Sequence, residues 1–421
     1  MAYTETKTTG YGTRVKNSCM GIGVGFALFI GATVLLWWNE GNSVKTADML
    51  EEAQEACVEM EKPEKKDASL EGELVCATAM ATTTDSLVDT EFGVGATAIS
   101  IQRKVEYYQW IEHSETKTED KLGGSQEEVT TYTYKKEWSD SPIDSEEFKD
   151  PAYQGNNMVL TNVEDEDQWA ENVSFGAYKL NENLIKSISS TEDVELVLSD
   201  DLLSQLDKNT KEAYERFYKK TTEVKDSVQT DSGYQYIHVK GNEIYYGLNP
   251  SVPQVGDVRV TFVKVVPAKA TIISEVTGDT FKPFKAKNGK SFQTLVMGKK
   301  TIDEIFEAEN STNKLMTWIW RLVGTLLVIA GLKGIFGIIE TLLKVVPFLS
   351  NIVGWGVGFV CTIVGIVWSL IVIAIAWVFY RPVLGIALLV IAGLLIWIFA
   401  FGGKNKIKQL ANKKNEEPAQ A

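Results

Sequence analysis

The sequence predicts an α+β membrane protein in which four transmembrane helices, one N-terminal and three C-terminal, anchor a large sheet-rich extracytoplasmic domain. Two observations carry this prediction: four long apolar runs near the chain ends and an acidic middle between them. A helix rises about 1.5 Å per residue, so about 20 residues cross a hydrocarbon core of roughly 30 Å. The runs that approach or exceed this length are 18–38, 315–332, 352–380 and 383–401.

The charges divide the chain into the same parts. The formal net charge is −14 over 421 residues. Residues 1–38 carry +2 and residues 311–421 carry +7, which leaves −23 on residues 39–310. A segment this acidic repels a phosphate backbone, so nucleic acid is not expected as a partner. Metal cations and basic proteins stay open as partners.

Residues 1–17 are predicted to be a short cytoplasmic N-terminus, and residues 18–38 the first transmembrane helix. The run follows basic residues, as a signal peptide does. Its apolar core is longer than usual for a signal peptide, and "WWNEG" after it lacks a small-residue cleavage pattern. We therefore interpret it as an uncleaved signal anchor.

Lysine and arginine accumulate on one side of the four predicted spans, and this bias places both chain ends in the cytoplasm. The cytoplasmic side, including the basic tail at 402–421, collects Lys7, Arg14, Lys16, Lys333, Lys344, Lys404, Lys406, Lys408, Lys413 and Lys414. The other side keeps only Lys45, Lys314 and Arg381 near the ends of the spans. The domain at 39–310 is then lumenal or periplasmic. Aromatic residues typical of an interfacial belt gather at the outer ends of the spans: Trp37, Trp38, Trp318, Trp320, Trp377 and Tyr380.

Two arginines occur next to or inside the apolar runs. Arg381 and Pro382 separate the third run from the fourth. We interpret them as the outer turn of a tight helical hairpin, because proline ends a helix and arginine reaches the headgroups. Arg321 lies inside the second span, where a charge is costly. It either extends to the outer surface or lines a polar path through the helices.

The segment at 333–347 is predicted to be an amphipathic helix in the cytoplasmic interface, because its polar and apolar residues fall on opposite helical faces. Two glycine pairs with a spacing of four residues favour close helix packing, within one chain or between chains. These pairs are Gly21 with Gly25 in the first span and Gly354 with Gly358 in the third.

The domain at 39–310 has the pattern of an α+β fold dominated by sheet. Aromatic and β-branched stretches at 105–113 and 129–138 predict a hairpin. The stretches at 256–266 and 270–276, followed by the turn signal Asn288-Gly289, predict a meander.

Helices are expected at 200–220 and 301–310, where Thr301 and Glu304 form a capping box. Cys57 and Cys76 lie in the same domain and are a candidate disulfide if it is exported. The alternative is two buried, reduced side chains, because the sequence does not fix the distance between them.

We find no motif for catalysis, cofactor binding or metal binding. A triad or a histidine-based zinc site would need His113 or His238, and each lies in a β stretch where an ordinary histidine is more common than a catalyst. Zinc-protease, paired-cysteine, nucleophile-elbow and phosphate-loop motifs are absent. We therefore expect no catalytic, cofactor or metal site.

Five stretches, in order along the chain, are "LLWWNEGNSVKTA", "VEYYQWIE", "YTYKKEWSDSPIDSEEF", "NPSVPQVGDVRVTF" and "WVFYRPVLG". Together they resemble the transmembrane protein 43 family, also called LUMA. The resemblance implies one N-terminal span, a large extracytoplasmic domain and three C-terminal spans. It also implies self-association and organisation of envelope proteins in the endoplasmic reticulum and inner nuclear membrane of animals. In bacteria it implies the inner membrane with a periplasmic domain.

Two functions of different classes follow from these observations. The first is a non-enzymatic membrane scaffold that forms homo-oligomers and contacts other membrane or envelope proteins through its domain. The alternative is a membrane enzyme or permeation device that acts on lipids or ions, with Arg321 and the glycine-rich spans around its site.

Overall fold

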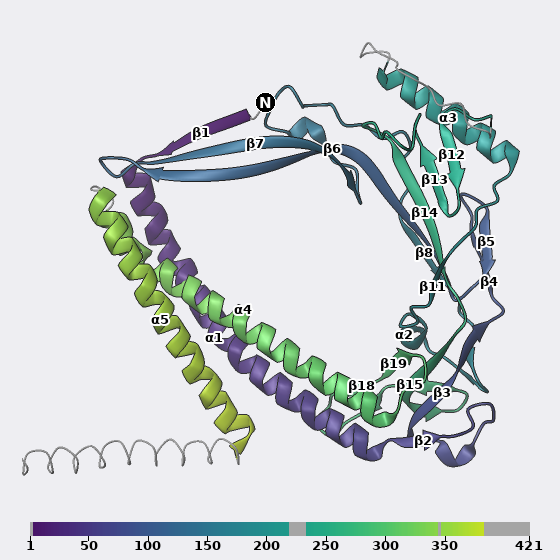
Figure 1. The fold of residues 1–421 in the computed structure, drawn as a ribbon. Helices are drawn as coiled ribbons and strands as arrows, with labels where there is room; N and C mark the ends of the chain where they lie inside the picture. The colour runs from purple at the N-terminus through teal and green to yellow at the C-terminus, as the bar shows by residue number, and fades with distance from the viewer. Residues whose placement is uncertain (1–2, 219–232, 344–346, 383–421) are drawn as a thin grey trace, which may run out of the picture. The chain divides into compact units, whose positions relative to one another are not determined.

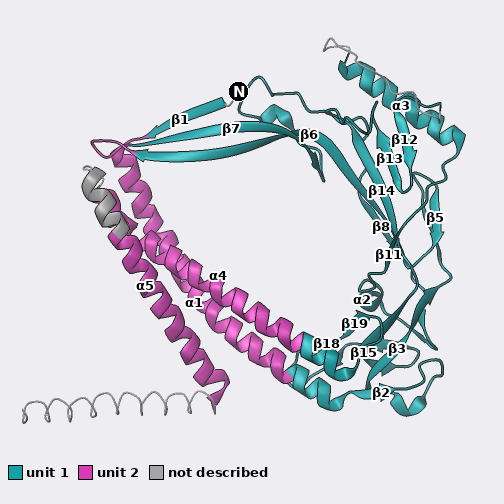
Figure 2. Ribbon diagram, viewed as in Figure 1, with its two compact units in different colours: residues 1–8, 49–119, 126–308 teal, residues 9–48, 120–125, 309–421 magenta. Residues whose placement is uncertain are grey.

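The computed structural model describes residues 3–218, 233–343 and 347–382, and the chain divides into two compact units (Figures 1 and 2). The sheet-rich unit comprises residues 1–8, 49–119 and 126–308, and the helical unit comprises residues 9–48, 120–125 and 309–421. The predicted fourth span at 383–401 and the basic tail at 402–421 lie outside the described residues.

Three long helices dominate the helical unit: α1 (Tyr11–Ala56), α4 (Ile302–Leu343) and α5 (Pro347–Tyr380) (Figure 1). Each contains a stretch long and apolar enough to cross a membrane. Only 17%, 22% and 28% of these stretches, respectively, are buried. Most apolar side chains of the three helices therefore face outward.

Two helix boundaries differ from the prediction. The first helix does not end at Trp38 but continues to Ala56, because Met49, Leu50 and Ala53 pack into an apolar cluster of the sheet-rich unit. The second difference is that α4 continues unbroken through Leu332 to Leu343. The described part of the predicted interfacial helix is thus a continuation of the second span's helix. No proline lies between Leu332 and Pro347 to break it.

Within the helical unit α1 and α4 run antiparallel. Near one end the hydroxyls of Ser43 and Thr317 lie 2.7 Å apart, and near the other end those of Ser18 and Thr341 lie 2.6 Å apart. α5 runs parallel to α1, because residues further along α5 contact residues further along α1. The indole nitrogen of Trp368 donates to Thr33, and that of Trp377 donates to Glu40. Three consecutive membrane crossings require this alternation of direction.

Glycine brings the backbones of α1 and α4 together. A Cβ atom on Gly25 would lie 2.7 Å from both the carbonyl oxygen of Gly331 and the amide nitrogen of Ile335. A Cβ atom on Gly331 would lie 2.7 Å from the amide nitrogen of Phe29. These are backbone atoms, so a larger side chain at either glycine would force the two helices apart.

An eight-stranded sheet forms one part of the sheet-rich unit. Its order is β1-β7-β6-β14-β13-β12, with β8 on β6 and β11 on β14. The strands are β1 (Tyr3–Thr9), β6 (Ser100–Asp120), β7 (Gln126–Ser139), β8 (Glu166–Trp169), β11 (Thr191–Asp193), β12 (Ile237–Lys240), β13 (Glu243–Tyr246) and β14 (Val258–Val265). Strands β6 and β7 confirm the predicted hairpin and extend it at both ends.

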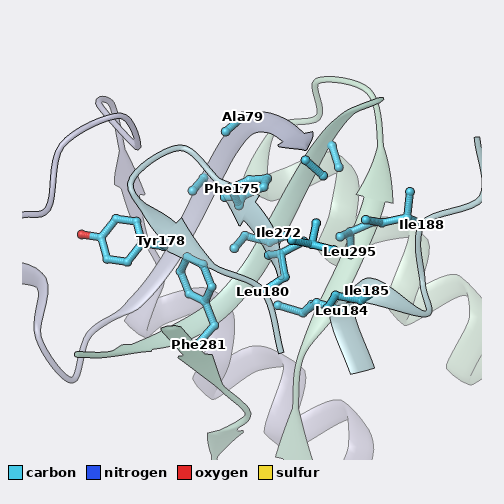
Figure 3. Close-up of a cluster of buried hydrophobic side chains, with 14 of the residues drawn as sticks. Ala79, Phe175, Tyr178, Leu180, Leu184, Ile185, Ile188, Ile272, Phe281 and Leu295 are labelled. Atoms are coloured by element: carbon cyan, nitrogen blue, oxygen red, sulfur yellow. The ribbon is translucent and has the colours of Figure 1, made fainter. Parts of the chain in front are cut away.

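A seven-stranded sheet forms the other part. Its strands are β2 (Val58–Met60), β3 (Leu74–Thr83), β9 (Val173–Phe175), β10 (Tyr178–Lys179), β15 (Ala268–Thr277), β16 (Thr280–Lys282) and β19 (Thr294–Met297). The pairings run β15-β16-β10-β9-β3, and β3 pairs with β15 again, so five strands close on themselves. The cluster in Figure 3 buries a large side chain from each of four of these strands: Phe175, Tyr178, Ile272 and Phe281.

The predicted meander is wrong. β14 and β15 are consecutive in the chain but belong to different sheets, so they do not pair with each other. Pro267 lies between them and has no amide hydrogen to donate to a continued ladder. The turn at Asn288-Gly289 connects a separate small hairpin of β17 (Phe284–Lys285) and β18 (Ser291–Phe292).

Short elements complete the sheet-rich unit. The helix predicted at 200–220 is confirmed as α3 (Asp200–Tyr218). The capping box that begins α4 is also confirmed, because the amide of Glu304 donates to the Thr301 hydroxyl and the amide of Thr301 donates to the Glu304 carboxylate. The other elements are α2 (Glu182–Ile185), the hairpin of β4 (Ser86–Asp89) and β5 (Val94–Thr97), and the 3₁₀ turns Ala68–Leu70 and Ser145–Glu147.

The N-terminal residues make contacts that the sequence did not predict. In the sheet-rich unit, β1 pairs with β7. In the helical unit, Arg14 lies 2.7 Å from Asp120, the last residue of β6, and donates to the carbonyl oxygen of Gly124 in the following turn at 2.9 Å. The predicted topology places residues 1–17 and the hairpin on opposite sides of a membrane. A molecule in which residues 18–38 cross a membrane therefore cannot also make these contacts.

Candidate functional site

A buried ion pair joins α1 to α4 in the helical unit. Arg321 donates from Nε and Nη2 to the two carboxylate oxygens of Glu40, at 2.6 and 2.8 Å. The side chain of Glu40 is 3% exposed and that of Arg321 is 13% exposed. This bidentate geometry is the strongest form of a carboxylate–guanidinium contact.

Aromatic side chains from α4 and α5 contact the pair. The indole nitrogen of Trp377 donates to Glu40 at 2.7 Å, so the carboxylate accepts three hydrogen bonds. The guanidinium carbon of Arg321 lies 4.8 Å from the ring centre of Trp318 and 5.5 Å from that of Trp377. Cation–π attraction and exclusion of water both strengthen the pair. The pair therefore links all three helices.

Polar contacts continue from the ion pair along α1 and α4. The Asn39 amide donates to the Thr317 carbonyl at 3.2 Å, and the Asn313 amide donates to the Ser43 carbonyl at 3.0 Å. The Thr317 hydroxyl donates to the carbonyl of Asn313 and lies 2.7 Å from the hydroxyl of Ser43. These residues repeat every four positions on each helix, so they form one polar stripe between the two.

A small cavity opens beside the ion pair, with a volume of about 240 Å³. All three helices line it, and three of its side chains are cationic: Lys314, Arg321 and Arg381. Arg381 lies just beyond the end of α5, with its guanidinium carbon 5.8 Å from the Trp377 ring. Among the residues that the structure describes, no acidic side chain lines the cavity.

The structure brings several of the predicted membrane-end residues together. Trp37 packs against Tyr380, with ring centres 5.7 Å apart. A Cβ atom on Gly41 would lie 2.5 Å from the Tyr380 ring, so only a residue without a side chain leaves room for this ring. Trp318, Trp377 and Arg381 line the cavity, although Trp318 is itself 66% exposed, and Trp38 and Trp320 do not line it. Pro382 follows α5 and is exposed.

Sequence reasoning found Arg321 but missed its partner. Glu40 follows the apolar run of 18–38, in the segment predicted to begin the extracytoplasmic domain. A signal was present, because Asn39 and Ser43 on one helix and Thr317 and Arg321 on the other repeat at the spacing of a helical face.

The two glycine pairs have different surroundings. Gly25 is packed against α4, and a Cβ atom on Gly21 would lie 3.9 Å from the carbonyl oxygen of Gly334. Gly358 has open space at its Cβ position. Gly354 lies within α5, in a part of the helix whose side chains are outside the description.

Cys57 and Cys76 are free thiols in the structure, in the same apolar cluster of the sheet-rich unit. The candidate disulfide is therefore not formed there. Burial raises the pKa of Cys57 to about 12 and that of Cys76 to about 11. Both thiols are protonated at neutral pH and are poor nucleophiles.

Two further groups bear on chemistry in the sheet-rich unit. His238 donates a hydrogen bond from Nε2 to the carbonyl oxygen of Gly247 at 3.0 Å, and burial lowers its pKa. His113 is exposed and lies 3.8 Å from Glu137. Neither histidine belongs to a metal cluster, since the described residues contain no group of three or more His, Cys, Asp or Glu placed to hold a metal.

Asp257 is a second buried acid, 1% exposed. One of its carboxylate oxygens accepts from the Tyr245 hydroxyl and from the Gln254 amide, while the other has no partner among the described residues. Burial raises the pKa of Asp257 to about 7. A Cβ atom on Gly247 would lie 2.4 Å from the unpartnered oxygen, so this carboxyl is packed against backbone. Its surroundings are those of a structural group.

Comparison with known proteins identifies the chain's relatives. The family model described as transmembrane protein 43 matches residues 107–382. Transmembrane protein 43 of Rattus norvegicus is 28% identical over 391 residues, which cover 90% of this chain and 89% of the relative. The Homo sapiens protein is 28% identical over 397 residues, with 91% and 90% covered.

The transmembrane protein 43 homolog of Drosophila melanogaster is 26% identical over 373 residues, with 87% of this chain and 90% of the relative covered. No solved structure matches the chain. The family match extends from within β6 to the end of α5 and includes Arg321 and Trp377. The chain belongs to the transmembrane protein 43 family.

Proposed function

We propose that this protein is a non-enzymatic membrane scaffold. Its helical unit anchors it in a bilayer, its sheet-rich unit contacts other membrane or envelope proteins, and it self-associates to organise the membrane in which it resides. The observation that carries the proposal is the outward-facing apolar surface of the three long helices, joined in one chain to a large folded unit.

The outward-facing side chains support the membrane anchor. Met20, Val24 and Phe26 on α1 are 68%, 62% and 52% exposed. Leu322 on α4 is 62% exposed and Phe379 on α5 is 66% exposed. Apolar side chains covering all three helices would aggregate in water, and lipid is the solvent that they match.

The paired state of Arg321 supports a scaffold over an enzyme or permeation device. The alternative function rested on Arg321 as a charge available to a substrate or ion. In the structure both carboxylate oxygens of Glu40 contact it, and its guanidinium lies against two tryptophan rings. An arginine with these partners serves to hold helices together.

Self-association is supported by Gly358. Its Cβ position faces open space on α5, and a glycine on an outer helix surface allows a second helix to approach closely. The test is particle mass by light scattering in mild detergent. We expect an oligomer whose size falls in Gly358→Leu, with the outward-facing Val367→Leu on the same helix as the control. A strictly monomeric wild type without co-purifying protein contradicts the proposal.

For the topology we propose cytoplasmic chain ends and an extracytoplasmic domain at 39–310. The distribution of basic residues and the alternating directions of α1, α4 and α5 support it. In a membrane this topology requires β1 and Arg14 to leave the contacts described above.

Single-cysteine labelling with a membrane-impermeant maleimide tests the sidedness, in a variant whose four native cysteines are alanine. With reagent only on the cytoplasmic side, we expect Thr4→Cys to react and Thr116→Cys to be protected. Equal reaction of both positions would mean that residues 18–38 do not cross and that the β1–β7 pairing is kept.

For the location we propose the endoplasmic reticulum and inner nuclear membrane in a eukaryotic host, or the inner membrane with a periplasmic domain in a bacterial host. The relatives support a membrane location by name, since each is a transmembrane protein. Fluorescence microscopy of the tagged chain with membrane markers tests it, and a uniform cytosolic signal would contradict it.

A further inference from the structure

We propose that the cavity beside the Glu40–Arg321 pair binds the phosphate of an anionic phospholipid headgroup. This inference rests on the proposed embedding of the three helices in a membrane. It assigns a specific lipid class to the outer end of the helical unit, with Lys314 and Arg381 as the residues that bind the phosphate.

The charge balance of the cavity favours an anion. Glu40 and Arg321 neutralise each other through their bidentate contact. Lys314 and Arg381 then remain as two uncompensated positive charges on the lining. Among residues 3–218, 233–343 and 347–382, neither of these two makes an ion pair within 4.0 Å.

The size of the cavity fits a phosphate group. About 10–15 Å³ of such cavity volume holds one water, so about 240 Å³ has room for several waters or for one phosphate with its first solvation partners. Polar side chains of Ser43, Asn313 and Thr317 form part of the lining, which suits the ester and free oxygens of such a group.

The position of the cavity in the sequence favours a lipid as the source of the phosphate. Lys314 immediately precedes the apolar run at 315–332, and Arg381 immediately follows the run at 352–380. Both cations therefore lie at the ends of predicted spans, where headgroup phosphates are found. The exposed Leu315 beside Lys314 continues into the apolar surface that acyl chains would cover.

The lining favours an anionic over a zwitterionic headgroup. A choline or ethanolamine group would need a carboxylate or a free aromatic face, and the described part of the chain places no acidic side chain on the cavity lining. The two tryptophan rings of the lining already face guanidinium groups: Trp318 that of Arg321, and Trp377 those of Arg321 and Arg381. Phosphatidylglycerol therefore matches the site better than phosphatidylcholine.

The experiment uses the full chain in nanodiscs of phosphatidylcholine containing phosphatidylglycerol, followed by transfer to detergent and native mass spectrometry. We expect wild type to retain phosphatidylglycerol in preference to phosphatidylcholine. A membrane-proximal cation contributes about fivefold to binding of an anionic lipid. Lys314→Gln and Arg381→Gln should each lower retention by about that factor, and the double variant by roughly 25-fold.

The matched control is the double variant Lys179→Gln and Lys240→Gln, which removes the same charge from exposed positions in β10 and β12 of the sheet-rich unit, outside the predicted spans and their ends. Its retention should equal that of wild type. Equal loss in both double variants, or equal retention of the two lipids by wild type, overturns the proposal. Displacement of the lipid by millimolar inorganic phosphate would identify a free-anion site and overturn the assignment to lipid.

Two further measurements distinguish failure of this proposal from failure of the proposed membrane anchor and from misfolding of the variants. Resistance of the membrane-bound chain to carbonate extraction tests the anchor, so its loss contradicts the proposed function. Carbonate-resistant protein without lipid preference contradicts only the headgroup site. Circular dichroism of the double variant should match wild type, and the single Lys314→Gln variant, whose side chain is exposed, gives an independent test without disturbing the fold.

Discussion

Removing the charge of Glu40 is expected to destabilise the helical unit strongly. In Glu40→Gln, Arg321 loses its counter-charge while its side chain stays mostly buried, in contact with Trp318 and Trp377. Loss of one partner of a buried ion pair costs about 3–5 kcal/mol, because the remaining charge is desolvated without compensation. Glutamine keeps the size of the side chain and one oxygen for the Trp377 hydrogen bond. The loss of stability therefore reports mainly on the missing charge.

The second step is a double-mutant cycle with Arg321→Met. The single variants each leave one buried charge, whereas the double variant leaves none. The double variant should therefore lose much less stability than the sum of the two single variants, with a coupling of about 2 kcal/mol or more.

Thermal unfolding of the full chain in mild detergent, followed by circular dichroism, measures these differences. Since about 1 kcal/mol shifts the melting temperature by about 2–4 °C in mid-sized domains, each single variant should melt about 6–20 °C lower. Lys333→Met serves as the control, because it removes an exposed cation from the same helix. Additive losses in the double variant would refute the view that the pair is one buried unit.

Three other predictions concern packing and titration. Gly25→Leu should destabilise the helical unit by about 3 kcal/mol or more, because its Cβ meets backbone atoms, whereas Gly23→Leu, with open space, should melt near wild type. In the sheet-rich unit, Asp257 holds its proton up to about pH 7 when folded but releases it near its ordinary pKa when unfolded. The folded state therefore binds more protons in this window, so stability should fall from pH 4 to about pH 7, and Asp257→Asn should flatten that slope in denaturant titrations. Cys57 and Cys76 should react with maleimide at neutral pH only after denaturation, because burial keeps both thiols protonated; rapid labelling of the native chain would contradict the burial.

The helices could be predicted from the sequence because their signal is local. Runs of apolar residues of membrane length define the central parts of α1, α4 and α5 without reference to any other residue. Their ends could not be predicted in this way. Met49 and Leu50 extend α1 into the sheet-rich unit by packing against residues that are distant in sequence, such as Ile273.

Pairing between distant segments is the part that the sequence did not reveal. The strands at 258–265 and 268–277 are both clear from composition, but the sheet to which each belongs depends on partners that are distant in sequence. β14 pairs Val258 with Tyr107, 151 residues away, and β15 pairs Ala268 with Ala81, 187 residues away. Glu40 is a similar case. Its sequence neighbours identify the end of an apolar run, and its function depends on an arginine in another helix.

The physics of helix association in lipid explains why α1 and α4 carry both glycines and an ion pair. In lipid, apolar side chains gain nothing by leaving their solvent, so helix association depends on close packing and polar contacts. Close packing at Gly25 and Gly331 supplies attraction, but a helix displaced by one turn, about 5.4 Å, could still find other apolar contacts. Such a displacement would separate Glu40 from Arg321 and leave two buried charges unpaired. The ion pair thus penalises every register but one, which is a role that buried polar groups fulfil in other helix pairs.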